Sequence, residues 1–254
     1  MLQLVLRTLT GEPAAQQCGR GSPHLRRRRH GRYRGRMTYT GHVTVGGSAQ
    51  TRELAHLVIT KIAVGEYNNN CYLLRCVNTG EQLLIDAAAE PDRLISLAGD
   101  SGLATVFTTH AHRDHWTALA DVVAATGAAH EASAIDGELI DVPVTIAIAD
   151  GDTVRVGDVQ LTAIHIVGHT EGSLVLLYDD PEGPPHLFTG DCLFPGGVGN
   201  TRGDAEKFAS LLGDVETKLF GRLPDETWVY PGHGDDTTLG TERPHLAEWR
   251  ERGW

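Results

Sequence analysis

Hydrophobic and polar positions in the first half of the chain alternate between strand-like and helix-like spacing. β-Branched and apolar runs predict strands, asparagine and glycine clusters predict turns, and leucine and isoleucine three or four positions apart predict helices. The pattern gives, in chain order, a strand over 57–64, a turn at 68–70, strands over 71–76 and 82–85 around a turn at 78–80, a helix over 90–98, a buried strand over 103–108 and a helix over 116–126.

The second half opens with a hairpin whose two-residue Gly157-Asp158 turn separates two alternating segments. The same reasoning predicts strands over 153–156, 159–166, 173–178, 186–188 and 227–230, and helices over 205–220 and 244–250. Strands and helices therefore alternate in two similar halves. Such an order favours an α/β (α+β) fold in which two sheets pack together and helices cover their outer faces.

Residues 1–36 differ from the rest of the chain. They contain nine arginines and one acidic residue, a side-chain charge of +8, so residues 37–254 carry −19 of the total of −11. This Gly-, Pro- and Arg-rich stretch has no apolar periodicity after Leu6, which predicts a disordered extension. Three explanations are open: an arm that binds nucleic acid or a partner, an organelle transit peptide, or a start assigned too early, with Met37 the first residue. We favour the last or a tail without function, and expect one domain over 37–254.

The overall composition narrows the class of protein. With 254 residues, of which 41% are hydrophobic, the chain can bury one sizeable core, and no stretch approaches the roughly 20 apolar residues of a membrane span. A net charge of −11 argues against a general nucleic-acid or membrane-surface binder. The four cysteines form no paired motif, so we expect reduced thiols in a cytoplasmic protein: Cys18, Cys71, Cys76 and Cys192.

Histidine is the unusual component of the sequence. Thr109-His110-Ala111-His112-Arg113-Asp114-His115 places three histidines and one aspartate directly after the buried strand over 103–108. Imidazole and carboxylate are the ligands that Zn²⁺ and similar ions take in proteins. In an extended backbone His110 and His112 point the same way, and Asp114 and His115 follow on the next turn. The motif therefore predicts a metal site at the end of a strand.

Three further segments place a histidine or an aspartate beside a glycine at the end of a predicted strand. They are Gly168-His169-Thr170, Thr189-Gly190-Asp191 and Pro231-Gly232-His233-Gly234. Glycine permits the tight turn that lets one ligand point inward. If these strand ends share one edge of the sheets, the four segments form a single site.

Taken in order, these motifs resemble the metallo-β-lactamase superfamily, and within it the glyoxalase II (hydroxyacylglutathione hydrolase) branch, over residues 55–240. The resemblance implies a four-layer αββα sandwich with two divalent ions, zinc first and iron or manganese as alternatives, at one edge. It implies that His110, His112 and His169 hold one ion, that Asp114, His115 and His233 hold the other, and that Asp191 bridges them. Asn70-Cys71-Tyr72 and the glycine-rich stretch 191–200 are also similar to that branch.

The resemblance implies a dinuclear hydrolase of a small thioester or ester. The two ions would activate a water, and Asp114 would orient it. Asp114 and the bridging Asp191 would be the two catalytic residues. Two departures from the family stand out. Glu171 replaces the proline common after Gly-His-Thr, and only about 20 residues follow His233, where longer glyoxalase II enzymes add a helical glutathione-gripping domain. We therefore expect a short type and a thiol carrier other than glutathione.

Other functions of the same fold remain as alternatives. A mononuclear iron persulfide dioxygenase needs two histidines and one aspartate, and the further ligands Asp114, His115 and His233 favour a two-metal hydrolase. A nuclease would need a basic surface, and a non-catalytic scaffold would be expected to have lost ligands. Residues given no metal role are His56, His130, His165, His186 and His245, and Cys192, which we expect to be a packed small side chain.

Overall fold

The computed structural model describes residues 39–253, so the expected extension at 1–36 and the alternative start at Met37 lie outside the described residues. Two sheets dominate. The first has the strand order β1-β2-β3-β4-β5-β6-β7: Gln50–Glu53, Leu57–Val64, Asn69–Cys76, Gln82–Ile85, Thr105–Phe107, Ala129–Ser133 and Ile146–Ile148. The second has the order β15-β14-β11-β10-β9-β8: Thr237–Thr238, Trp228–Pro231, His186–Gly190, Leu174–Tyr178, Val159–His165 and Thr153–Val156. A small ribbon pairs β12 (Leu193–Phe194) with β13 (Gly197–Val198).

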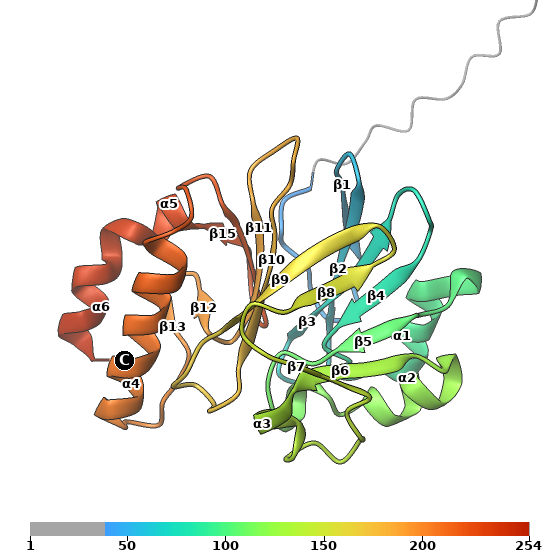
Figure 1. The fold of residues 1–254 in the computed structure, drawn as a ribbon, viewed down its shortest axis with the longest axis horizontal. Helices are drawn as coiled ribbons and strands as arrows, with labels where there is room; N and C mark the ends of the chain where they lie inside the picture. The colour runs from blue at the N-terminus through green and yellow to red at the C-terminus, as the bar shows by residue number, and fades with distance from the viewer. Residues whose placement is uncertain (1–38, 254) are drawn as a thin grey trace, which may run out of the picture. The chain divides into compact units, whose positions relative to one another are not determined.

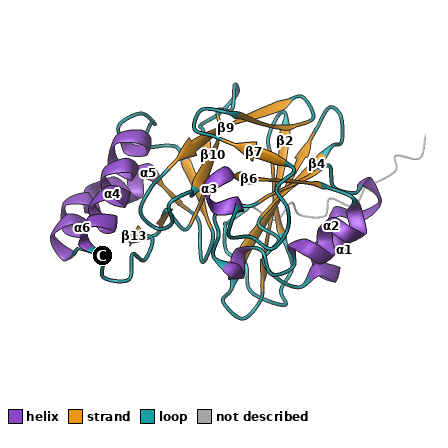
Figure 2. Ribbon diagram, turned by 60° about the horizontal axis from the view of Figure 1, so that its bottom comes forward, coloured by secondary structure: helices purple, strands orange, loops and turns teal. Residues whose placement is uncertain are grey.

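Helices lie on the two outer sides of the paired sheets (Figure 1). On one side are α1 (Pro91–Ala98) and α2 (Leu119–Thr126), and on the other are α4 (Ala205–Asp214), α5 (Leu239–Glu242) and α6 (Leu246–Arg252). The short helix α3 (Ala134–Gly137) follows β6 directly, and Figure 2 shows it beside β6. Among the helices of residues 39–253, none is both long and apolar enough to cross a membrane.

Three apolar cores separate these four layers. The central core lies between the sheets, where the ring of Tyr72 from β3 meets Phe188 and Tyr230 edge-on at 5.4 and 5.6 Å. A second core joins the first sheet to α1 and α2, and a third joins the second sheet to α4 and α6. Burial of apolar surface on both faces of each sheet is the main favourable term in the stability of this arrangement. The expected αββα sandwich is confirmed.

Most predicted elements are present with small shifts at their ends. β2 spans the predicted residues, and the hairpin of β8 and β9 turns at Gly157-Asp158 as expected. The turn predicted at 68–70 is wrong in part, because Asn69 and Asn70 are the first residues of β3 and pair with β2. The helix predicted from 116 begins at Leu119, and the one predicted over 205–220 changes from α- to π-helical hydrogen bonding at Val215.

Several elements were not predicted, and they lie mostly at sheet edges. β1 and β7 close the two edges of the first sheet, and their exposed polar and apolar residues show no clean alternation. β6 reads Ala-His-Glu-Ala-Ser, a polar pattern that nevertheless becomes buried because α3 and neighbouring strands enclose it. Tertiary surroundings, rather than intrinsic preference, decide strand formation at such positions.

A buried histidine of β11 sets an expected pH dependence of stability. Nδ1 of His186 lies 2.9 Å from the Tyr230 hydroxyl, and burial together with Arg52 lowers the pKa of His186 from 6.5 to about 4. The unfolded chain therefore binds this proton first as the pH falls. The resulting stability is complete above about pH 6.5 and decreases towards pH 4, by up to about 3 kcal/mol.

We expect His186→Gln to remove this part of the acid loss in urea unfolding from about pH 4.5 to 8. The exposed residue His56 provides a control, and His56→Gln is measured in parallel to account for the loss of one imidazole as such. An unaltered slope in His186→Gln would show that this histidine does not contribute.

Candidate metal centre

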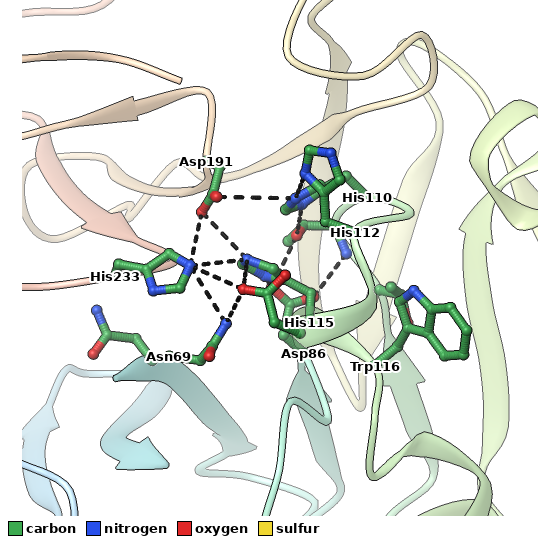
Figure 3. A network of polar contacts seen from close by, with 12 residues as sticks. Asn69, Asp86, His110, His112, His115, Trp116, Asp191 and His233 are labelled. Carbon is green, nitrogen blue, oxygen red and sulfur yellow. Dashed lines mark hydrogen bonds and ion pairs between the residues drawn. The ribbon is translucent and has the colours of Figure 1, made fainter. Parts of the chain in front are cut away.

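The predicted ligands lie on loops that follow strands of both sheets, and Figure 3 shows His110, His112, His115, Asp191 and His233 gathered in one place. His110 to His115 follow β5 and end in a short 3₁₀ turn, Arg113–His115. His169 follows β9, Asp191 follows β11, and His233 follows β14. Since β11 and β14 run parallel, both deliver their ligands to the same edge. The structure brings all seven predicted residues together.

Three histidines form what we call the first ligand group: His110, His112 and His169. The ring nitrogens that face one another are Nε2 of His110, Nδ1 of His112 and Nε2 of His169. They form a triangle with sides of 3.1, 2.9 and 3.3 Å. Nitrogens bound to one tetrahedral zinc at about 2.0–2.1 Å lie about 3.3 Å apart. The donor set and its spacing therefore fit a single divalent ion.

The second ligand group consists of Asp114, His115 and His233. Oδ2 of Asp114 lies 3.7 Å from Nε2 of His115 and 3.4 Å from Nε2 of His233, and the two imidazole nitrogens are 3.2 Å apart. Two nitrogens and one carboxylate oxygen suit the same class of ions. Asn69 of β3 adds a side-chain N–H that donates to Asp114 Oδ2 at 2.9 Å.

Asp191 lies between the two groups and turns one oxygen to each. Its Oδ2 is 3.5 Å from Nε2 of His169 and 4.0 Å from Nε2 of His110. Its Oδ1 is 3.3 Å from Nε2 of His115 and 3.6 Å from Nε2 of His233. A carboxylate with this orientation can bind two neighbouring cations at once, one through each oxygen.

In four of the histidines, the ring nitrogen that faces away from the ligand groups (the outer nitrogen) contacts an oxygen atom. This contact orients the nitrogen that faces the ligand groups (the inner nitrogen). Nδ1 of His169 donates to the Asn200 carbonyl at 3.0 Å, and Nδ1 of His233 donates to the Tyr67 carbonyl at 2.9 Å. Nδ1 of His115 lies 2.7 Å from Asp86 Oδ2, and Nδ1 of His110 lies 3.0 Å from Thr109 Oγ1. A proton held on the outer nitrogen leaves the inner lone pair free for a cation.

Burial shifts the pKa of His110 and His169 in one direction, and two aspartates shift the pKa of His115 in the other. Burial lowers the pKa of His110 well below its usual value and that of His169 to about 4, so both are neutral at physiological pH. Burial also acts on His115, but Asp191 and Asp86 outweigh it and hold its pKa well above the usual value. In the metal-free protein a proton on His115 thus faces Asp191, and a cation at the second ligand group would release that proton.

Ionised aspartates complete the electrostatics of the site. The hydrogen bond from His233 lowers the pKa of Asp114 further than burial raises it. For Asp191, burial alone would raise the pKa, but the neighbouring histidines, His115 first, hold it far below the usual range. Both carboxylates are therefore negatively charged at neutral pH and can bind cations.

Two buried aspartates that the sequence analysis missed support the ligand loops. Asp86, directly after β4, accepts bonds from Thr109 N at 2.8 Å and from Thr109 Oγ1, in addition to its contact with His115. Asp136 on α3 accepts from Ala111 N at 2.8 Å and from Thr170 Oγ1 at 2.7 Å, which joins the loops of the first ligand group. The position of Asp86 at the end of a predicted strand is a signal that could have identified it. Asp136 gives no such signal, because it lies on a short helix that was not predicted.

Gly232 explains why the ligand loops can come so close. A Cβ atom at this position would lie 2.4 Å from Asp191 Oδ1 and 2.6 Å from the ring of His115. Any side chain there would therefore push the bridging carboxylate away from the second ligand group. Gly232, which precedes His233, thus allows two loops to come close together and also gives the backbone the freedom to turn.

The histidines given no metal role lie apart from these two groups. His165 at the end of β9 contacts the Glu171 carbonyl at 2.8 Å, and His130 contacts Thr108 Oγ1 at 3.0 Å. Cys192 is buried next to Asp191 in the apolar core of the second sheet, as expected.

Two hollows open beside the ligand groups. One, of about 640 Å³, is lined by Tyr67, Ala88, Ala89 and Asp114, and the other, of about 440 Å³, by Ile135, Leu139 and Lys207. Both also touch His112, His169, Asn200 and Arg202. The metal centre therefore lies at the junction of two spaces large enough for parts of a small molecule.

Comparison with known proteins agrees with this geometry. Residues 64–233 match the model of the metallo-beta-lactamase superfamily. A hydroxyacylglutathione hydrolase of a Polaromonas species is 35% identical over 181 residues, which cover 70% of this chain and 66% of that protein. The chain thus spans about two thirds of the length of this relative.

Solved structures show the same architecture. The crystal structure of ETHE1 from Myxococcus xanthus has a TM-score of 0.65 and 31% identity, and covers 74% of this chain and 82% of its own. The structure of TTHA1623 in a di-iron-bound form has a TM-score of 0.60 and 31% identity, and covers 72% and 96%. With the family model matching 64–233, the chain belongs to the metallo-beta-lactamase superfamily.

Proposed function

We propose that this protein is a dinuclear metal-dependent hydrolase that cleaves a small thioester or ester. The observation that carries the proposal is the orientation of Asp191, whose two oxygens face two separate ligand groups. A mononuclear site of the dioxygenase kind would need only two histidines and one aspartate. The second ligand group, with His115 and His233 3.2 Å apart, supports a second ion. The di-iron form of TTHA1623, a structural neighbour, supports the same reading.

Divalent ions held by the two ligand groups would lower the pKa of a water and polarise a substrate carbonyl. The residues of the chain supply orientation. Asp114 is ionised, is held at Oδ2 by Asn69, and can orient the attacking water. In the reaction, water oxygen bonds to the acyl carbon, the carbon–sulfur bond breaks, and the sulfur leaves as a thiol after taking up a proton. The products are a carboxylic acid and a thiol.

The two hollows support a substrate with two arms. An acyl group and its thiol or alcohol carrier extend in opposite directions from the reacting carbonyl. The hollow lined by Ala88 and Ala89 and the one lined by Ile135 and Leu139 meet at His112 and His169, where that carbonyl would lie.

We keep zinc as the first expectation, with iron or manganese as alternatives, and cytoplasmic location as part of the proposal. The described cysteines, Cys71, Cys76 and Cys192, are free and buried.

Metal analysis beside a hydrolysis assay tests the proposal. We expect inductively coupled plasma mass spectrometry to find close to two divalent ions per chain, and the same preparation to hydrolyse thioesters with release of free thiol. One iron per chain with oxygen consumption on a persulfide would replace the proposal by the dioxygenase alternative. Metal-free protein that binds no ion after reconstitution would contradict both.

A further inference from the structure

A buried ion pair lies directly behind the turn that carries His233. The side chains of Lys61 on β2 and Asp236 are both 0% exposed, and Lys61 Nζ lies 2.6 Å from Asp236 Oδ1. The ammonium also donates to the carbonyls of Gly41 at 2.7 Å and Gly234 at 2.8 Å. All three of its N–H groups are therefore used, each on a different acceptor.

These bonds join three parts of the chain that are far apart in sequence. Lys61 belongs to the first sheet, Gly41 to the segment before β1, and Gly234 follows His233 directly. Asp236 is held from its other oxygen as well, since Oδ2 accepts from Tyr39 Oη at 2.6 Å and from Trp228 Nε1 at 2.8 Å. The pair thus clamps the residues after His233 between β2 and the 39–41 segment.

β3 holds residues on both sides of His233. Asn70 Nδ2 donates to the carbonyls of Pro231 and Gly234, both at 2.9 Å, and Tyr72 Oη donates to Pro231 at 2.6 Å. Gly234 has a positive φ of 74°, so the chain turns sharply just after the ligand. Bonds on both sides of this turn fix where the His233 ring can point.

Stability alone does not account for this arrangement. The cost of removing two charges from water offsets most of their attraction, so apolar residues of similar size could fill the space equally well. An apolar pair, however, could not donate to the Gly234 carbonyl, which would then keep only the hydrogen bond from Asn70. We propose that Lys61 and Asp236 are positioning residues of the second ligand group, which hold the turn at Gly234 so that the His233 ring faces Asp114 and His115.

The inference rests on the proposed two-metal centre, and zinc titration of metal-free protein tests it. We expect Lys61→Met to weaken the second zinc by about tenfold or more and to leave the first unchanged, because His110, His112 and His169 do not depend on this turn. The double variant Lys61→Met/Asp236→Asn removes the unpaired charge. It should regain stability but not the second zinc. Equal weakening of both zincs, or recovery of the second in the double variant, would overturn the inference.

A matched control is Arg243→Met. Arg243 also forms an ion pair, with Asp225 at 2.5 Å, and donates to the Phe220 carbonyl, but it contacts neither ligand group. This variant should keep both zincs. If Lys61→Met does not fold, Tyr39→Phe removes one donor to Asp236 in a milder way and should weaken the second zinc alone.

Hydrogen exchange of the metal-free protein separates this inference from the proposed function. We expect amides of residues 232–236 to exchange faster in Lys61→Met than in wild type, while those of 109–115 stay unchanged. If wild-type protein binds neither zinc, iron nor manganese, the proposed function fails, and faster exchange at 232–236 still supports the positioning role. Unchanged exchange at 232–236 would overturn it whatever the metal content.

Discussion

Replacing Asp191 by alanine is expected to abolish hydrolysis, lowering turnover by about 10³-fold or more, while the protein remains folded. Among residues 39–253, this carboxylate alone turns one oxygen to each ligand group, at 3.3 Å from His115 and 3.5 Å from His169. Without it, neither ion keeps its full set of ligands, and the positive charge gathered in the site loses its central counter-charge. Metal content and thioester turnover of the same preparation measure the two effects.

Two further variants sharpen this test. Asp191→Asn keeps the shape of the side chain and one oxygen acceptor but removes the negative charge, so we expect it to retain more metal than Asp191→Ala and still turn over slowly. Asp225→Ala removes a carboxylate that pairs with Arg243 away from the site and should behave as wild type. Full turnover with two ions in Asp191→Ala would show that Asp191 does not bridge.

The sequence could predict that the seven candidate ligands come together, because each one carries a local signal. His110 to His115 lie within six residues, and His169, Asp191 and His233 each stand next to a glycine at a strand end. Strand ends are local features of the hydrophobic pattern, and their convergence follows from sheet packing. The four layers could be predicted for the same reason, since the buried strands and amphipathic helices that form them are strongly patterned.

The supports of the ligands could not be predicted in the same way. Lys61 lies in a strand predicted from its apolar neighbours, and only the packed structure shows that its charge is buried against Asp236, 175 residues away. Asp136 lies in a short helix after a polar strand that the pattern did not reveal. Such partners are set by tertiary contacts between distant segments, which leave no periodic trace in the chain.

Asp86 is expected to show the largest effect among these supports. Its buried carboxylate holds Thr109 N, Thr109 Oγ1 and His115 Nδ1 within 2.7–2.8 Å. Asp86→Ala would leave a buried backbone N–H and a charged imidazole without their partner, at a cost of about 3–5 kcal/mol in the free energy of unfolding. The left-handed backbone at Asp86, with φ of 57°, adds strain for alanine. Urea unfolding of metal-free protein measures this loss.

Asp86→Asn isolates the charge from the fold. Asparagine tolerates the left-handed backbone and can still accept from Thr109 N, so most of the stability should remain. Its neutral amide no longer provides the negative charge that holds Nδ1 of His115 and so orients the ring. We therefore expect zinc to bind about 10–100-fold more weakly at the second ligand group, while the first ligand group keeps its affinity. The exposed Asp100→Asn is the matched control. If both Asp86 variants bound two zincs as wild type does, His115 would owe its orientation to Asp191 alone.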